Sequence, residues 1–292
     1  MFFKILKDDL RHQGLQYQEG LNTDCNEFDP NPDCKNGGLF YSDGANILTF
    51  SRSGSKIATV TLPNGEVSIQ VDEKTYKSHQ IILNNIRDLW TVETFQWLKG
   101  QGVDIHAEND IVLRCASERG HLDLVKYFVE QGADVNANNG YALVIASELG
   151  RWDIVKYLLE HGADILADDG YAFSMVSQKG RLDIVRYLIE HGFNVHTYND
   201  SMLRDASERG HLDLVKYLIE HDADIHAKDD QALYLSTRNG HLDVAKYLIQ
   251  QGANIHIYED CILCADSKYG HFDISKYLID QNVDDDSKKG NI

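Results

Sequence analysis

Basic residues are scarce in this 292-residue sequence, and their scarcity excludes several kinds of ligand. Lys and Arg together number 28 against 46 Asp and Glu, which gives a formal net charge of -18. Affinity for nucleic acids and for anionic membrane surfaces comes mainly from Lys and Arg, so the composition argues against both. The acidic surplus instead favours solubility and a partner that carries a positive patch.

Long apolar runs and an even set of cysteines are also missing. No stretch approaches the ~20 apolar residues that a membrane-spanning helix needs. The N-terminal nine residues become acidic too soon for a secretory signal. Five cysteines, an odd number, fit a reducing compartment. We therefore expect an intracellular protein that is neither secreted nor membrane-spanning.

Proline is rare as well, and Pro30, Pro32 and Pro63 all precede a region that repeats itself every 30 residues. Four residue types keep this step in register over six copies, which chance cannot explain. The four ladders are Gly120, Gly150, Gly180, Gly210, Gly240 and Gly270; Tyr127, Tyr157, Tyr187, Tyr217, Tyr247 and Tyr277; Asp123, Asp153, Asp183, Asp213, Asp243 and Asp273; and Lys126, Lys156, Arg186, Lys216, Lys246 and Lys276.

One copy predicts two short helices. Asp200 suits a helix N-cap, since its carboxylate can accept a hydrogen bond from a free amide. A first helix over about residues 201–208 would end at Gly210, as helices end at glycines that enter the left-handed region. A second helix from about Leu212 to His221 carries apolar residues on one face. Residues that suit a cap occupy the column of Asp200 in every copy: Asp110, Gly140, Gly170, Asp230 and Asp260.

The segment GHLDLVKYLIE at 210–220, the following Ala223-Asp224-Ile225 and the first-helix residues Leu203 and Ala206 resemble the ankyrin repeat. The period is 30 and no copy contains Thr-Pro, whereas the family has a period of 33 and a Thr-Pro-Leu-His signature. The resemblance implies a mainly α fold, an ankyrin-type helical-repeat solenoid with short turns in place of extended fingers. The repeat sequence is most similar to those of the many ankyrin proteins of giant, amoeba-infecting DNA viruses of the mimivirus type. This resemblance implies that the protein is located in the cytoplasm of an infected cell.

The repeats set the predicted domain boundaries. We expect a small β-rich N-terminal domain over 1–77, a divergent capping repeat over 78–106, six repeats over 107–286 and a disordered tail over 287–292. The helical part should contain about thirteen or fourteen helices. Strand candidates are 2–6, 15–19 and 39–42, together with a hairpin of 56–62 and 66–72 around Asn64-Gly65. The N-terminal domain should fold by itself or dock on the first repeat.

Residues that could carry chemistry have simpler explanations. Ladders of histidines at His211, His241 and His271 and at His196, His226 and His256 are spaced too widely to share one metal ion, because stacked helices lie ~8–10 Å apart. Cys261 and Cys264 form a Cys-x-x-Cys pair at ordinary repeat positions, without the strand that a redox motif follows. No phosphate loop or nucleophile motif is present. We expect no catalytic residue, metal or cofactor.

Comparison of the copies distinguishes residues that maintain the fold from residues that are free to vary at the surface. Glycines and apolar columns are constant, whereas three first-helix columns change from copy to copy, and the concave face of a solenoid is its usual binding surface. Aromatic and Arg residues dominate binding hot spots. The candidate partner-binding residues are Arg114, Arg119, Arg204, Tyr234, Arg238 and Tyr269.

The favoured hypothesis is a monomeric, non-catalytic scaffold that binds a host or viral protein through this concave face. The alternative is an enzyme or adaptor activity in the N-terminal domain, with the array recruiting the substrate; a third is a structural component of a particle. Asp205 is a weak point in the array, because its column is otherwise apolar. A carboxylate there predicts either a shifted helix or a cation within reach.

Overall fold

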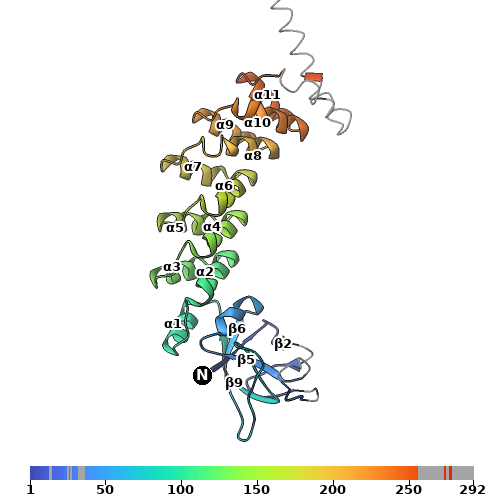
Figure 1. Cartoon of the computed structure of the whole chain (residues 1–292), viewed down its shortest axis with the longest axis vertical. Helices are drawn as coiled ribbons and strands as arrows, with labels where there is room; N and C mark the ends of the chain where they lie inside the picture. The colour runs from blue at the N-terminus through green and yellow to red at the C-terminus, as the bar shows by residue number, and fades with distance from the viewer. Residues whose placement is uncertain are drawn as a thin grey trace, which may run out of the picture. The chain divides into compact units, whose positions relative to one another are not determined.

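The computed structural model describes residues 1–12, 15–24, 26, 28–31, 37–255, 273, 276 and 277. A β-rich region comes first and paired helices follow it (Figure 1). The chain divides into two compact units, an N-terminal unit over Met1–Asp164 and a C-terminal unit over Ile165–Ile292. The predicted fold class, a mainly α repeat array behind a β-rich region, is therefore confirmed.

The β-rich region is built on a seven-stranded antiparallel sheet. Its strands are β1 (Phe2–Leu6), β4 (Gly20–Thr23), β5 (Leu39–Asp43), β6 (Lys56–Thr61), β7 (Ile69–Gln70), β8 (Tyr76–Ser78) and β9 (Gln80–Asp88), in the order β4-β9-β6-β1-β5-β8-β7. A two-stranded ribbon of β2 (Arg11–His12) and β3 (Leu15–Gln16) and the 3-10 helix η1 (Ile47–Ser53) complete it. The sheet encloses a core of Leu6, Tyr17, Leu39, Tyr41, Ala58, Val60, Ile81 and Leu83.

The sequence located most strands but mispaired two of them. The candidates at 2–6, 39–42 and 56–62 are confirmed as β1, β5 and β6, and only two residues of 15–19 form a strand. The predicted hairpin is wrong, because β6 pairs with β1 and β9 while β7 pairs with β8. The turn at Asn64-Gly65 does form, with Gly65 at a φ of 86°. Since both edges of β6 are occupied, the chain leaving the turn cannot return to it.

The boundary expected at residue 77 is too early. β9 covers Gln80–Asp88 and pairs with both β4 and β6, and its Ile81 and Leu83 are fully buried in the sheet core. The divergent capping repeat therefore contains a single helix, α1 (Val92–Gly100), which begins after Thr91 accepts a hydrogen bond from the Thr94 amide. The sequence placed a divergent repeat at this point, but it could not show that a strand stands where the first helix of that repeat was expected.

Beyond α1 the helices come in pairs. The first helices are α2 (Ala107–Arg119), α4 (Ala137–Glu148), α6 (Ala167–Gln178), α8 (Ser201–Arg209) and α10 (Ala227–Arg238); the second helices are α3 (Leu122–Glu130), α5 (Trp152–Glu160), α7 (Leu182–Glu190), α9 (Leu212–Glu220) and α11 (Leu242–Gln250). The predicted helices at 201–208 and 212–221 are thus confirmed to within a residue. Apart from Asp273, Lys276 and Tyr277, the sixth repeat and the tail lie outside the described residues.

The connections are short, as the 30-residue period predicted. Residues 92–255 contain no strand. Three consecutive residues with positive φ mark the beginning of each first helix, such as Tyr198, Asn199 and Asp200 at 54–56° just before α8. The N-cap expected at Asp200 is wrong in detail, because that residue is left-handed and its side chain makes no cap hydrogen bond. Its carboxylate binds elsewhere.

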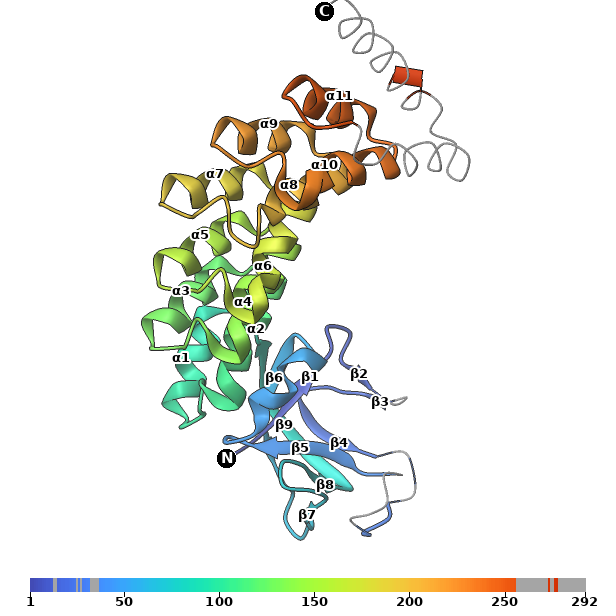
Figure 2. The same ribbon diagram turned by 45° about the horizontal axis from the view of Figure 1, so that its top comes forward.

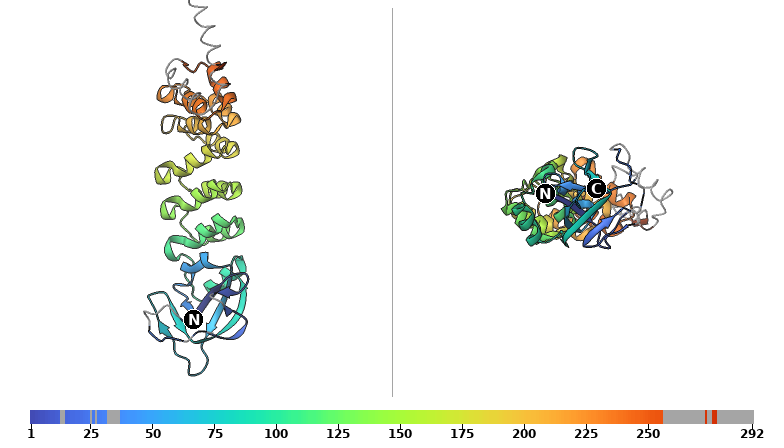
Figure 3. Two further views of the ribbon diagram at one scale, coloured as in Figure 1. Left: turned by 90° about the vertical axis from the view of Figure 1, so that its right-hand side faces the viewer. Right: turned by 90° about the horizontal axis from the view of Figure 1, so that it is seen from below.

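The β-rich region docks on the first repeats within the N-terminal unit. η1 packs on α2, where the Ser51 hydroxyl lies 3.7 Å from the Cys115 thiol and both groups are buried. Phe3 of β1 makes an edge-on contact with Trp97 of α1, with ring centroids 6.0 Å apart. Figures 2 and 3 show the sheet region against α1 and α2. The sheet therefore covers the end of the array, which is the docked arrangement expected as an alternative.

Candidate protein-binding surface

A buried aspartate ties each of three described repeats to the next one. Asp230 is 2% exposed, and one of its carboxylate oxygens accepts hydrogen bonds from His226 Nδ1 at 3.0 Å and from the Asn254 backbone amide at 2.9 Å. The equivalent bridges are His106–Asp110–Asp134 and His196–Asp200–Asp224. These aspartates, which belong to the column of Asp200, and the histidines four residues before them thus form a repeated hydrogen-bonded bridge, the aspartate bracket.

In the repeat that has Gly140 in place of the buried aspartate, a different side chain binds the equivalent backbone amide. Where Gly140 replaces the aspartate, Asn136 replaces the histidine. The Asn136 side chain accepts from the Asp164 amide at 2.8 Å and donates to the Gly162 carbonyl at 3.0 Å. The backbone amide that begins the next turn is therefore bound in both kinds of repeat, which keeps adjacent repeats in register.

The histidine ladder of His211 and His241 joins the start of a second helix to the end of the first helix in the preceding repeat. His211 donates from Nε2 to the Gln178 carbonyl at 2.8 Å, and His241 does the same to the Glu208 carbonyl at 2.9 Å. The ring of His241 occupies the space beside Gly210, where an added Cβ would lie 2.4 Å from its Nδ1. These carbonyls end the preceding first helices, so the histidines satisfy acceptors that the helix itself leaves free.

The tyrosines of the ladder are buried or half-buried in the packing between repeats. Tyr217 is 7% exposed and its ring lies tilted against that of His221, with centroids 4.0 Å apart. The Arg186 guanidinium of the preceding repeat lies 4.8 Å from the Tyr217 ring centroid. Lys126 lies over Tyr157 and Lys216 over Tyr247 in the same way, both at 5.8 Å. Burial raises the pKa of the Tyr217 hydroxyl. The lysine ladder therefore also contacts aromatic rings, in addition to solvent.

Asp205 is accommodated by a hydroxyl of the neighbouring repeat. Ser174 of α6 donates to its carboxylate at 2.8 Å, α8 keeps its regular path, and no ion pair to Asp205 occurs among the described residues. Burial raises the pKa of the carboxyl, and the Ser174 hydrogen bond together with the nearby charges of Arg204 and Arg209 opposes that rise. The cations therefore act at a distance, and the direct partner is one that the sequence did not reveal.

In the N-terminal unit the predicted arginines lie on α2, and each contacts the chain itself. Arg114 donates from Nη2 to the Glu108 carbonyl at 2.9 Å, which closes the left-handed turn before the helix. Arg119 is exposed, and its guanidinium lies 4.6 Å from the ring centroid of Trp90. Arg119 therefore presents a stacked, pre-positioned cation at the surface, whereas Arg114 serves the turn.

Two further residues on this face were missed. Arg52 of η1 reaches the first-helix layer, 3.6 Å from the Glu118 carboxylate and 6.0 Å from the centroid of the Tyr141 ring. A residue of the β-rich region therefore contributes to the array surface. Tyr141 could have been found, because its column also varies and contains Tyr171; no sequence signal marks Arg52.

In the C-terminal unit the candidates separate into two kinds. Arg204 uses three nitrogens within the chain, donating to the Tyr198 and Asn199 carbonyls and to Gln231. Arg238 is exposed and Tyr234 is partly exposed on α10, where successive turns bring them onto one face. Tyr269 lies outside the described residues. The structure thus brings Tyr234 and Arg238 together and gives Arg204 a role in the turn.

Exposed apolar residues gather near the turns of the C-terminal unit. Leu166 is 37% exposed, Tyr171 is 46% exposed and Tyr198 is 49% exposed. The Tyr198 ring lies against Gly170, where an added Cβ would be 2.6 Å from it. Aromatic side chains held at a surface in this manner are typical anchors for a protein partner.

The described part of the chain holds one free thiol and no cluster of metal ligands. No three His, Cys, Asp or Glu side chains among those residues converge on a point where a metal could bind. Cys115 is a free, buried thiol, while Cys261 and Cys264 lie outside the described residues. None of the described helices has the length and apolar composition needed to cross a membrane.

Paired helices in register, joined by short turns and bearing a variable first-helix face, define an ankyrin-repeat protein, a class of protein–protein interaction module. A family model for ankyrin repeats in three copies matches residues 88–169, and an ankyrin-repeat model of many copies matches 203–249. The resemblance read from the sequence is thereby confirmed.

Similar proteins occur in Acanthamoeba polyphaga mimivirus. One ankyrin repeat protein of this virus is 32% identical over 132 residues, which is 44% of this chain and 40% of that protein. A second is 32% identical over 141 residues, 43% of this chain and 46% of that protein. An uncharacterized protein of the virus is 31% identical over 130 residues, 94% of its own length. The chain contains ankyrin repeats, and it spans less than half the length of the first two relatives.

Proposed function

We propose that this protein is a non-catalytic scaffold that holds a protein partner through the first-helix face of its repeats. The observation that carries the proposal is that, within each repeat, one set of residues fixes the structure and another set varies at the surface. Buried aspartates, histidines and glycines fix the register of adjacent repeats, while exposed first-helix residues differ from copy to copy. A rigid frame with variable side chains is the arrangement that solenoids use for binding.

Tyr234 and Arg238 are the best anchors among the six candidates. They lie one turn apart on α10, and aromatic and Arg side chains supply most of the free energy at protein interfaces. Arg119 is a third candidate, since Trp90 pre-positions its guanidinium. Arg114 and Arg204 would support the face by fixing the turns before their helices. Tyr269 remains a candidate on its sequence column alone.

The charge of the face suggests the chemistry of the partner. The column one turn after Arg114 reads Glu118, Glu148, Gln178, Glu208 and Arg238, so it is acidic in three of these five copies. The whole chain has a net charge of -18. A partner with a basic surface patch would be steered toward this face.

The proposal can be tested with a partner recovered by pull-down with the full chain. We expect the double substitution Tyr234→Ala/Arg238→Ala to weaken binding at least tenfold, or ~1.4 kcal/mol. Thermal stability should change little, because surface substitutions usually stay within ~0.5 kcal/mol each. The control is Asp213→Ala/Glu220→Ala, which changes two exposed residues on the second helix α9. If the folded Tyr234→Ala/Arg238→Ala variant binds fully and the Asp213→Ala/Glu220→Ala control loses binding, the partner binds to the second helices instead.

A further inference from the structure

The β-rich region contains a pocket that the protein-binding function does not use. Its volume is about 550 Å³, within the range of small-molecule sites. It lies where the central sheet opens, because the register between β1 and β5 stops at Phe3 and Ser42, whereas β1 stays paired with β6 as far as Leu6. The backbone of Lys4–Leu6 therefore borders the pocket on the side away from β6.

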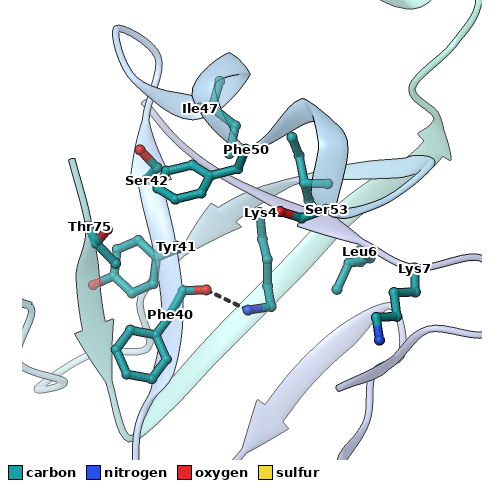
Figure 4. Close-up of a pocket in the computed structure, with 11 residues that line it drawn as sticks. Lys4, Leu6, Lys7, Phe40, Tyr41, Ser42, Ile47, Phe50, Ser53 and Thr75 are labelled. Carbon is teal, nitrogen blue, oxygen red and sulfur yellow. Dashed lines mark hydrogen bonds between the residues drawn. The ribbon is translucent and has the colours of Figure 1, made fainter. Parts of the chain in front are cut away.

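The walls of the pocket are mostly apolar and its charged groups are all cationic. Figure 4 shows Phe50 and Ile47 of η1 above the side chain of Lys4, with Phe40 and Tyr41 of β5 beside it. Among the described residues of the lining, Lys4 and Lys7 are the only charged side chains and no carboxylate is present. This is unusual in a chain with 46 acidic and 28 basic residues.

Lys4 is poorly compensated in this position. It is 5% exposed, its ammonium donates to the Phe40 carbonyl, and it lies 4.7 Å from the centroid of the Tyr17 ring. An ammonium can donate three hydrogen bonds. Burial lowers the pKa of Lys4 to about 7, and no nearby carboxylate in the described part of the chain opposes that shift. A buried cation without an anion destabilises the folded state, so an anionic ligand here would relieve an existing cost.

We propose that this pocket binds a small amphiphile with a carboxylate head group and an apolar tail. The carboxylate would accept a hydrogen bond from Lys4 Nζ, with Lys7 adding attraction at the exposed side of the pocket. The tail would pack on Phe50, Ile47 and Phe40. A smaller neighbouring depression shares Phe50 and Thr75 with the pocket. It is lined by Asp72, Glu73 and Lys74, so its net negative charge favours the carboxylate at the lysine end of the pocket.

The test is isothermal titration calorimetry of the full chain with octanoate and with 1-octanol, which has the same tail and no charge. We expect octanoate to bind at least tenfold more tightly than octanol. Lys4→Met, which keeps the length of the side chain, should lower octanoate affinity at least tenfold and leave octanol affinity nearly unchanged. Lys99→Met, an exposed lysine on α1, is the control for a lost positive charge and should bind octanoate as the native chain does.

A second variant protects the test against misfolding of Lys4→Met. Phe50→Asp places a negative charge in the wall of the pocket on a partly exposed residue of η1, and it should also abolish octanoate binding. Equal affinity of the native chain for octanoate and octanol would overturn the proposal. So would native octanoate affinity in folded Lys4→Met or Phe50→Asp, or no saturable binding of octanoate to the native chain at millimolar concentration.

Discussion

The aspartate bracket between repeats predicts a specific loss of stability when one carboxylate is removed. Asp230→Gly deletes the acceptor for both His226 Nδ1 and the Asn254 amide. The backbone can keep its shape, because Asp230 has a φ of 55° and glycine occupies the equivalent position at Gly140 and Gly170. The variant therefore isolates the side chain.

The magnitude follows from the two hydrogen bonds and the burial of the carboxylate. A hydrogen bond to a charged group contributes ~1.5–3 kcal/mol. Removal of the buried charge recovers part of its desolvation free energy, which offsets some of the loss. We expect a net destabilisation of ~3 kcal/mol, measured by urea denaturation with circular dichroism. Hydrogen exchange at the Asn254 amide should accelerate in the same variant, because its acceptor is gone.

The chain itself supplies the control and the rescue. Asp229 is also left-handed, at a φ of 56°, but exposed, so Asp229→Gly should change stability by no more than ~1 kcal/mol. The double variant His226→Asn/Asp230→Gly copies Asn136 and Gly140 and should recover ~1–2 kcal/mol of the loss. The reasoning is refuted if Asp230→Gly costs no more than Asp229→Gly.

Two further predictions concern the same unit. Burial raises the pKa of the Asp205 carboxyl, so the ionised form lowers stability at neutral pH and this loss disappears as the pH falls through the raised pKa. Asp205→Asn, which keeps an oxygen for Ser174, should stabilise the protein by ~1 kcal/mol near pH 7 and by less near pH 4 in thermal denaturation; an equal gain at both would contradict the prediction. Gly210→Ala should cost ~2–3 kcal/mol, since the new Cβ would displace His241, whereas Gly192→Ala, with open space at a φ of 87°, should cost only the ~1 kcal/mol of a left-handed alanine. Equal losses in the two alanine variants would show that His241 yields without cost.

The periodic part of the sequence was enough to predict the helical array. The signals that predict the helices are local and are present in each repeat. They are the glycines that end the first helices, the apolar residues at helical spacing and the shared 30-residue step. The helices at Ser201–Arg209 and Leu212–Glu220 follow from these signals alone. The exposed candidates Tyr234 and Arg238 also came from the sequence, because variable positions stand out against constant columns.

What the sequence could not determine depends on contacts between distant residues. The partners of β6 were decided by competition among strands, so the turn at Gly65 formed without its hairpin and β9 took the place expected for a helix. The carboxylate of Asp230 reaches the Asn254 amide in the turn that follows the second helix, not the cap of its own helix, because a left-handed backbone turns it that way. The buried Lys4 beside an apolar pocket required the sheet to open between β1 and β5. Local periodicity specifies helices, whereas strand pairing, inter-repeat hydrogen bonds and the burial of a charge exist only once the chain is folded.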